Sequence, residues 1–183
     1  NPTFSSGTNT SLVSASVSQL SLSGTGSTPN ISLSPTDQVV AVGDTVTLDV
    51  IVQHSSPINF VQIVLAFDNS NSFSIVDQST AEGLQPFTDL DEIFAGTSAI
   101  ENTYDTSSNK LRFSKSSFLG QVIGSTTQPA RLARFQLVPT SNLTASPALT
   151  FATGEVGTVL GVEGKVDPYD SGEGLTLVNP QFS

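Results

Sequence analysis

The residues best suited to chemistry are acidic side chains gathered near the end of the chain. Asp167, Asp170 and Glu173 fall within one short turn of sequence. Carboxylate and carbonyl oxygens are the ligands that a hard cation such as Ca²⁺ prefers. These three residues therefore form a candidate calcium site, and residues 101–105, with Glu101 and Asp105, form a second. Neither segment matches an EF-hand loop, and solvated acidic turns are the favoured explanation of both.

Groups suited to catalysis are few. His54 is the one histidine, it precedes Ser55, and the chain has no cysteine. A Ser–His–acid triad needs three groups brought together in space, and a serine beside a histidine carries little information in a chain so rich in serine. We expect His54 to be exposed in a turn. Asp89 and the nearby Asp91 and Glu92 resemble the solvated start of a helical turn over residues 88–94, so the sequence does not predict an enzyme.

Composition excludes several other classes. The 183 residues include 6 Lys and Arg against 16 Asp and Glu, for a net charge of −10. Such a chain has little with which to neutralise phosphates, so we expect no nucleic-acid partner. Without cysteine there are no disulfides or thiolate metal sites. No apolar run is long enough to predict a membrane span, and we expect a secreted chain whose signal peptide has already been removed.

Charge is absent from the start of the chain, where the first charged side chain is Asp37. Low charge with much Ser, Thr and Gly is typical of a linker. However, residues 11–23 alternate apolar with small polar side chains, which is typical of a half-buried strand. We therefore divide the chain into an N-terminal extension, residues 1–29, and a domain, residues 30–183. The apolar residues of the candidate strand are Leu12, Val13, Ala15, Val17, Leu20 and Leu22.

The domain reads as a series of short strands separated by turn signals. Residues 45–53 alternate most clearly, and residues 59–67 are apolar on both faces, which favours a central strand. Further strands are predicted at residues 31–34, 39–42, 73–76, 110–114, 131–138, 148–151, 156–160 and 175–178. The predicted fold is all-β: a jelly-roll β-sandwich of about nine strands with an extra N-terminal strand.

Several segments resemble cohesin-like domains. Residues 31–35 and 42–50 are similar to the family's short first strand, Gly-Asp turn and long second strand. Residues 59–67, 130–137 and 174–178 resemble later strands of the family. Cohesin-like domains share this sandwich with carbohydrate-binding modules. The resemblance implies binding and scaffolding outside the cell, with dockerins as the partners of cohesins in cellulosomes, and it does not assign a dockerin site residue by residue.

Two functions follow from these features. The first is a structural subunit of an extracellular filament or pilus-like surface assembly, a homopolymer in which residues 11–23 of one copy complete the sheet of the next. The strand could equally pair within its own subunit. The alternative is a monomeric cohesin-like binding or adhesion module for a surface protein or glycan. Asn-x-Ser/Thr sequons also mark candidate glycosylation sites; these are Asn9, Asn30 and Asn142.

Overall fold

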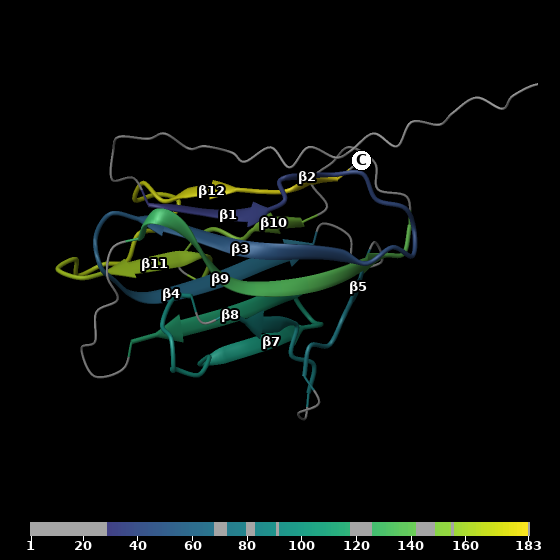
Figure 1. Cartoon of the computed structure of the whole chain (residues 1–183), viewed down its shortest axis with the longest axis horizontal. Helices are drawn as coiled ribbons and strands as arrows, with labels where there is room; N and C mark the ends of the chain where they lie inside the picture. Colours follow the sequence, from purple (N-terminus) through teal and green to yellow (C-terminus); the bar gives the residue numbers. More distant parts are fainter. Residues whose placement is uncertain are drawn as a thin grey trace, which may run out of the picture.

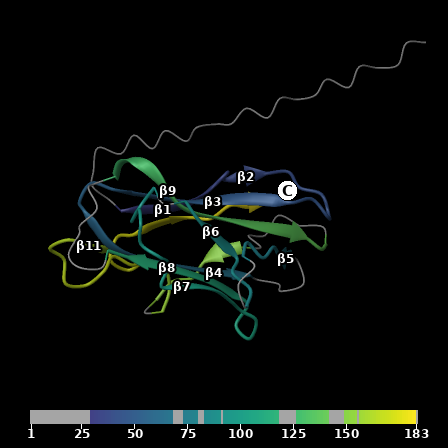
Figure 2. The ribbon, with the colours of Figure 1, turned by 60° about the horizontal axis from the view of Figure 1, so that its bottom comes forward.

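Two β-sheets packed face to face make up the molecule (Figures 1 and 2). The computed structural model describes residues 29–67, 73–79, 83–90, 92–117, 126–141, 149–154 and 156–182. Strands and loops account for all of these residues, and none of them is helical. Across the described residues there is accordingly no helix that is long and apolar enough to cross a membrane.

The first sheet has six strands, and the longest of them, β9 (Thr126–Pro139), pairs along most of its length with β3 (Val46–His54). On the other side of β3 lies β1 (Asn30–Ser34), which pairs in parallel with β12 (Thr176–Val178). The free side of β9 is covered by two short strands in succession; these are β5 (Phe73–Ile75) and β6 (Phe87–Asp89).

The second sheet has five strands and is centred on β4 (Ile58–Phe67), which is the longest of them. On one side β4 pairs with β8 (Lys110–Ser116), which in turn pairs with the edge strand β7 (Glu101–Asp105). On its other side β4 pairs with β10 (Leu149–Phe151) and β11 (Val159–Val162). A separate parallel pair joins β2 (Asp37–Gln38) to β13 (Gln181–Phe182).

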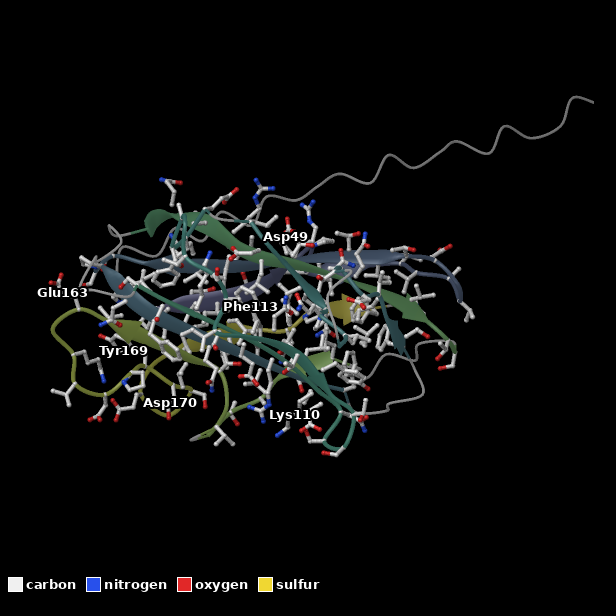
Figure 3. All side chains as sticks on the ribbon, turned by 90° about the horizontal axis from the view of Figure 1, so that it is seen from below. Asp49, Lys110, Phe113, Glu163, Tyr169 and Asp170 are labelled. Atoms are coloured by element: carbon white, nitrogen blue, oxygen red, sulfur yellow. The ribbon has the colours of Figure 1, made fainter. Side chains whose placement is uncertain are left out.

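Alternating side chains from the two sheets fill the space between them. On β3 the buried set is Val46, Leu48, Val50 and Val52, because successive residues of a strand point to opposite faces. In Figure 3, Phe113 of β8 lies between the two sheets. The ring of Phe113 contacts that of Phe87 on β6, with centroids 5.3 Å apart, so aromatic packing joins the sheets.

The structure confirms the predicted all-β sandwich and corrects three segments. Residues 88–94 do not begin a helical turn, since Phe87–Asp89 is a strand paired with β9. Residues 101–105 form edge strand β7. Residues 39–42 were expected as a strand but belong to a loop, where Val39 is 89% exposed. That loop ends in a turn in which Gly43 takes a positive φ of 90°, a conformation that glycine adopts without strain.

The N-terminal extension lies outside the described residues, apart from its last residue, Pro29. The predicted extra strand over residues 11–23, and with it Leu12, Val13, Ala15, Val17, Leu20 and Leu22, is therefore untested and stays a prediction. The boundary between residues 29 and 30 coincides with the start of β1 at Asn30.

Candidate protein-binding face

The predicted calcium loop is organised around a lysine. The Nζ atom of Lys165 donates to Oε2 of Glu173 at 3.0 Å and to the backbone oxygen of Asp167 at 2.9 Å. The Asp170 carboxylate instead accepts the backbone N–H groups of Gly172 and Glu173, both at 2.8 Å. Within the described part of the chain, no three His, Cys, Asp or Glu side chains lie close enough to hold a metal ion. Glu173 is thus engaged in an ion pair with Lys165, and calcium binding by Asp167, Asp170 and Glu173 stays a prediction.

The second acidic candidate also has a structural role. Asp105 ends β7, and its carboxylate accepts hydrogen bonds from the hydroxyls of Ser107 and Ser108, each at 2.6 Å. These hydrogen bonds, the one from Ser107 first, hold the pKa of Asp105 well below its usual range. Glu101, at the other end of β7, accepts a hydrogen bond from the Thr103 hydroxyl. The carboxylates of β7 thus organise their own hairpin.

His54 is not the exposed turn histidine that we expected. It is the last residue of β3, it continues the inward set of that strand, and it is only 3% exposed. Its Nδ1 accepts the backbone N–H of Ser56 at 2.9 Å, and its ring packs against Tyr169 with centroids 5.5 Å apart. His54 therefore closes one end of the core, where the loop that carries Tyr169 and Asp170 lies (Figure 3).

The acids near residue 90 form ion pairs across elements. Asp89, on β6, pairs with Lys115 of β8. Glu92 pairs with Arg131 of β9, and Arg131 holds the pKa of Glu92 below its usual value, chiefly through a side-chain hydrogen bond. Asp91 lies outside the described residues. Because each of these two carboxylates has a cationic partner, they do not form the acid pair that glycoside hydrolysis requires.

The glycosylation candidates divide between described and undescribed residues. Asn30 is the first residue of β1 and is only 7% exposed, with its side-chain nitrogen buried. A glycan would have to attach to that nitrogen, so the fold does not present Asn30 as an acceptor. Asn9 and Asn142 lie outside the described residues, and glycosylation there stays a prediction.

The outer surface of the five-stranded sheet has a character that sequence reasoning only partly anticipated. On β4, Phe60, Gln62, Val64 and Ala66 alternate with the core-facing set, as the apolar character of both faces of residues 59–67 had indicated. Phe60, Gln62 and Ala66 are half-buried. We call this surface, together with the outward side chains of β8, the β4–β8 face. The β8 residues on this side of the sheet are Lys110, Arg112, Ser114 and Ser116. Ser114 is buried there, as is Val64 on β4.

The β4–β8 face carries two cations that have no carboxylate partner among the described residues. The other four cations of the chain each have one. Lys110 lies opposite Asp105 in the strand register, but that carboxylate is engaged by Ser107 and Ser108. Arg112 lies between Val64 on β4 and Thr103 on β7. The alternation over residues 110–114 is the sequence signal that places both cations on one face.

The outer surface of the six-stranded sheet is different, because its polar groups bond to one another. Arg134 of β9 donates two hydrogen bonds to the carboxylate of Asp49 on β3, at 2.6 and 3.0 Å. Gln136 donates to Thr47 at 3.1 Å and accepts from Gln78 at 3.2 Å. We call this surface the β3–β9 face. Figure 3 shows Asp49 and Lys110 on opposite sides of the sandwich.

Comparison with known proteins identifies the fold. Neither a scan against protein-family models nor a search of curated protein sequences finds a match. The second type II cohesin module of the adaptor scaffoldin ScaA from Acetivibrio cellulolyticus has a TM-score of 0.59 at 13% identity, over 85% of this chain and 88% of that one. Type II cohesin A11 from Bacteroides cellulosolvens has a TM-score of 0.56 at 17% identity, over 84% and 98%.

A third similar structure is a complex. A chain of a mutant type II cohesin–X-dockerin complex from Acetivibrio cellulolyticus gives a TM-score of 0.57 at 13% identity, covering 85% of this chain and 96% of that one. The described residues therefore form a cohesin-like jelly-roll β-sandwich. The resemblance drawn from residues 31–178 is confirmed at the level of the fold.

Proposed function

We propose that this chain is a non-catalytic, cohesin-like module that binds another protein on its β4–β8 face. The observation that carries the proposal is the difference between cations: four of the six have carboxylate partners within the chain, while Lys110 and Arg112 have none among the described residues. Cations beside half-buried apolar side chains are typical of a surface that pairs with an oppositely charged partner.

The side chains of the β4–β8 face indicate which groups a partner should present. It should present carboxylates opposite Lys110 and Arg112 and an apolar side chain against Ala66, which lies opposite Lys110 in the strand register. A glycan fits this surface less well, because sugar sites normally offer exposed aromatic rings, and Phe60 is the one aromatic side chain of the face. The similar chain from a cohesin–X-dockerin complex supports a protein partner by analogy, and we propose an extracellular setting on the same ground.

The test starts from partners selected by display of secreted proteins of the source organism on the full chain. Each selected binder is then titrated against a Lys110→Gln/Arg112→Glu variant. We expect affinity to fall about tenfold for each altered position, which corresponds to about 1.4 kcal/mol each. Most of the loss from a rim charge should appear in the association rate and should diminish as salt is added.

A matched control alters charge on the opposite face while keeping its ion pair. The exchange Asp49→Arg/Arg134→Asp retains opposite charges at the two paired positions, so affinity should stay within about twofold of the wild type, roughly 0.4 kcal/mol. Binders that tolerate the Lys110→Gln/Arg112→Glu variant but are lost with the exchange on the β3–β9 face would overturn the assignment.

Polymerisation through residues 11–23 is the second candidate, and it rests on the alternation of that segment. Deletion of residues 1–28 separates it from the first candidate. A filament subunit should lose its higher oligomers on deletion and keep a folded domain. A protein-binding module should be monomeric in both forms and should keep its partner's affinity.

A further inference from the structure

Lys115 is unusual among the charged side chains because it points into the core. It follows Leu111 and Phe113 in the inward set of β8, and its side chain is 0% exposed. Its Nζ atom lies 2.5 Å from Oδ2 of Asp89, whose side chain is 24% exposed. Since Asp89 is on β6 and Lys115 is on β8, the pair joins the six-stranded sheet to the five-stranded sheet.

Apolar side chains flank this pair along its two strands. Phe87 precedes Asp89 by two residues on β6, and Phe113 precedes Lys115 by two on β8, with their rings 5.3 Å apart. The ion pair is thus the next contact along the same two strands. In the strand registers, Val61 lies opposite Lys115 and Ala133 opposite Asp89, and both are fully buried. An ion pair in such a setting loses most of its hydration, which costs much of what its Coulomb attraction contributes.

We propose that Lys115 and Asp89 condense to form an intramolecular isopeptide bond. The ammonium of Lys115 passes one proton to the carboxylate of Asp89, which gives an amine and a carboxylic acid. The nitrogen lone pair attacks Cγ of Asp89, the N–C bond forms, and the C–OH bond breaks. The hydroxyl leaves with a second proton from the nitrogen as one water molecule. The product is a secondary amide, and no oxidant, metal or cofactor enters the balance.

The geometry favours this step in two ways. The Nζ atom of Lys115 is 2.5 Å from Oδ2, the atom bonded to Cγ, and two groups held together by a folded chain react as if at a very high concentration. The product also removes two charges from an apolar site, where an amide is less costly to bury than separated ions. The partial exposure of Asp89 leaves the released water a route to solvent.

The cross-link would have a clear structural effect. It would tie β6 to β8, close the chain between residues 89 and 115 into a ring, and join the two sheets covalently. The chain has no cysteine, so a disulfide cannot do this. The result would be a sandwich that resists separation of its sheets by pulling, heat or proteases.

The test is intact-mass and tryptic-peptide analysis of the full chain after denaturation. The wild type should weigh less than its sequence mass by one water molecule. Trypsin has no site before Lys110, and acylated Lys115 is not cleaved, so residues 1–110 should appear in a branched peptide with residues 113–131. Lys115→Met and Asp89→Ala variants should each have their full sequence mass, with linear peptides.

Lys165→Met is the matched control, since it removes a lysine that is ion-paired at the surface; its mass deficit and branched peptide should persist. A wild-type chain of full mass that yields the linear peptides 113–115 and 116–131 would overturn the proposal and leave the pair as an ion pair. A mass deficit without the branched peptide would overturn it as well. Both readouts follow denaturation, so they do not depend on how well any variant folds.

Discussion

The two outer faces of the sandwich use their cations differently. On the β3–β9 face, Arg134 is held by Asp49 through two hydrogen bonds, and glutamine and threonine side chains satisfy one another beside it. On the β4–β8 face, Lys110 and Arg112 lack carboxylate partners in the described part of the chain and lie opposite Ala66 and Val64 of β4. Alternation in a β-strand thus lets one scaffold support a surface whose polar groups bond to one another and a surface whose cations have no carboxylate partner among the described residues.

The largest loss of stability should come from a substitution in the core that supports both faces. Phe113 lies between the sheets and contacts Phe87 (Figure 3). We expect Phe113→Ala to lower the free energy of unfolding by about 3–5 kcal/mol, since it removes a large buried ring and leaves a cavity. Urea unfolding followed by circular dichroism measures this. A loss below about 1 kcal/mol would mean that the two faces do not depend on a common core.

Charge reversal should destabilise the protein more on the β3–β9 face than on the β4–β8 face. Arg134→Glu removes the hydrogen bonds to Asp49 and places two carboxylates directly opposite each other, so we expect a loss of about 1–2 kcal/mol. Arg112→Glu breaks no ion pair within the described chain and should change stability by less than about 0.5 kcal/mol.

The same urea titration compares the two charge-reversal variants at low salt. An equal or larger loss for Arg112→Glu would contradict the contrast, because it would show that Arg112 already has a stabilising role within the chain.

The smallest expected effect is on the pH dependence of stability, through the ion pair of Glu92 and Arg131. Hydrogen bonding to Arg131 lowers the pKa of Glu92 in the folded chain. The stabilisation it gives is therefore complete above the pKa of an unfolded glutamate, about 4.3, and is lost as the pH falls through the lower folded value. Glu92→Gln should be slightly less stable than the wild type at pH 7. The difference should begin to shrink as the pH falls below about 4.3 and should vanish only below the lowered pKa of Glu92 in the folded chain.

The control for the acid experiment is Arg112→Gln on the β4–β8 face. Thermal melts between pH 7 and acid measure the stability of each variant. The difference in stability between Arg112→Gln and the wild type should stay constant over this range, because Arg112 has no carboxylate partner in the described chain. Convergence of Arg112→Gln with the wild type in acid would show that Arg112 does pair with a carboxylate.

Much of the fold could be predicted from alternation. The inward set of β3, from Val46 to Val52, and the central position of β4 are local patterns that a reader of the sequence can see. β6 and β7 could not be found in this way, because three to five residues carry too little periodicity, and they become strands by pairing with β9 and β8. Residues 39–42 are apolar enough for a strand, and Val40 packs against the core, but they form no ladder with a strand of either main sheet.

The candidate sites were harder to predict, because composition identifies residue types but does not show on which side of a strand each side chain lies. The acid cluster near the end of the chain predicted calcium, and the ion pair of Lys165 with Glu173 in the same loop was not foreseen. His54 and Lys115 were placed wrongly or overlooked although each continues the inward alternation of its strand. The parity that places Lys110 and Arg112 outward also places Lys115 inward, so strict use of alternation would have found the face and the buried pair together.

Hydrogen exchange with and without a bound partner tests the central claim most directly. We expect binding to slow amide exchange in β4, β8 and β7, residues 58–67 and 101–116. The exchange rates of β3 and β9, residues 46–54 and 126–139, should stay unchanged. Protection confined to β3 and β9 would contradict the assignment of the β4–β8 face.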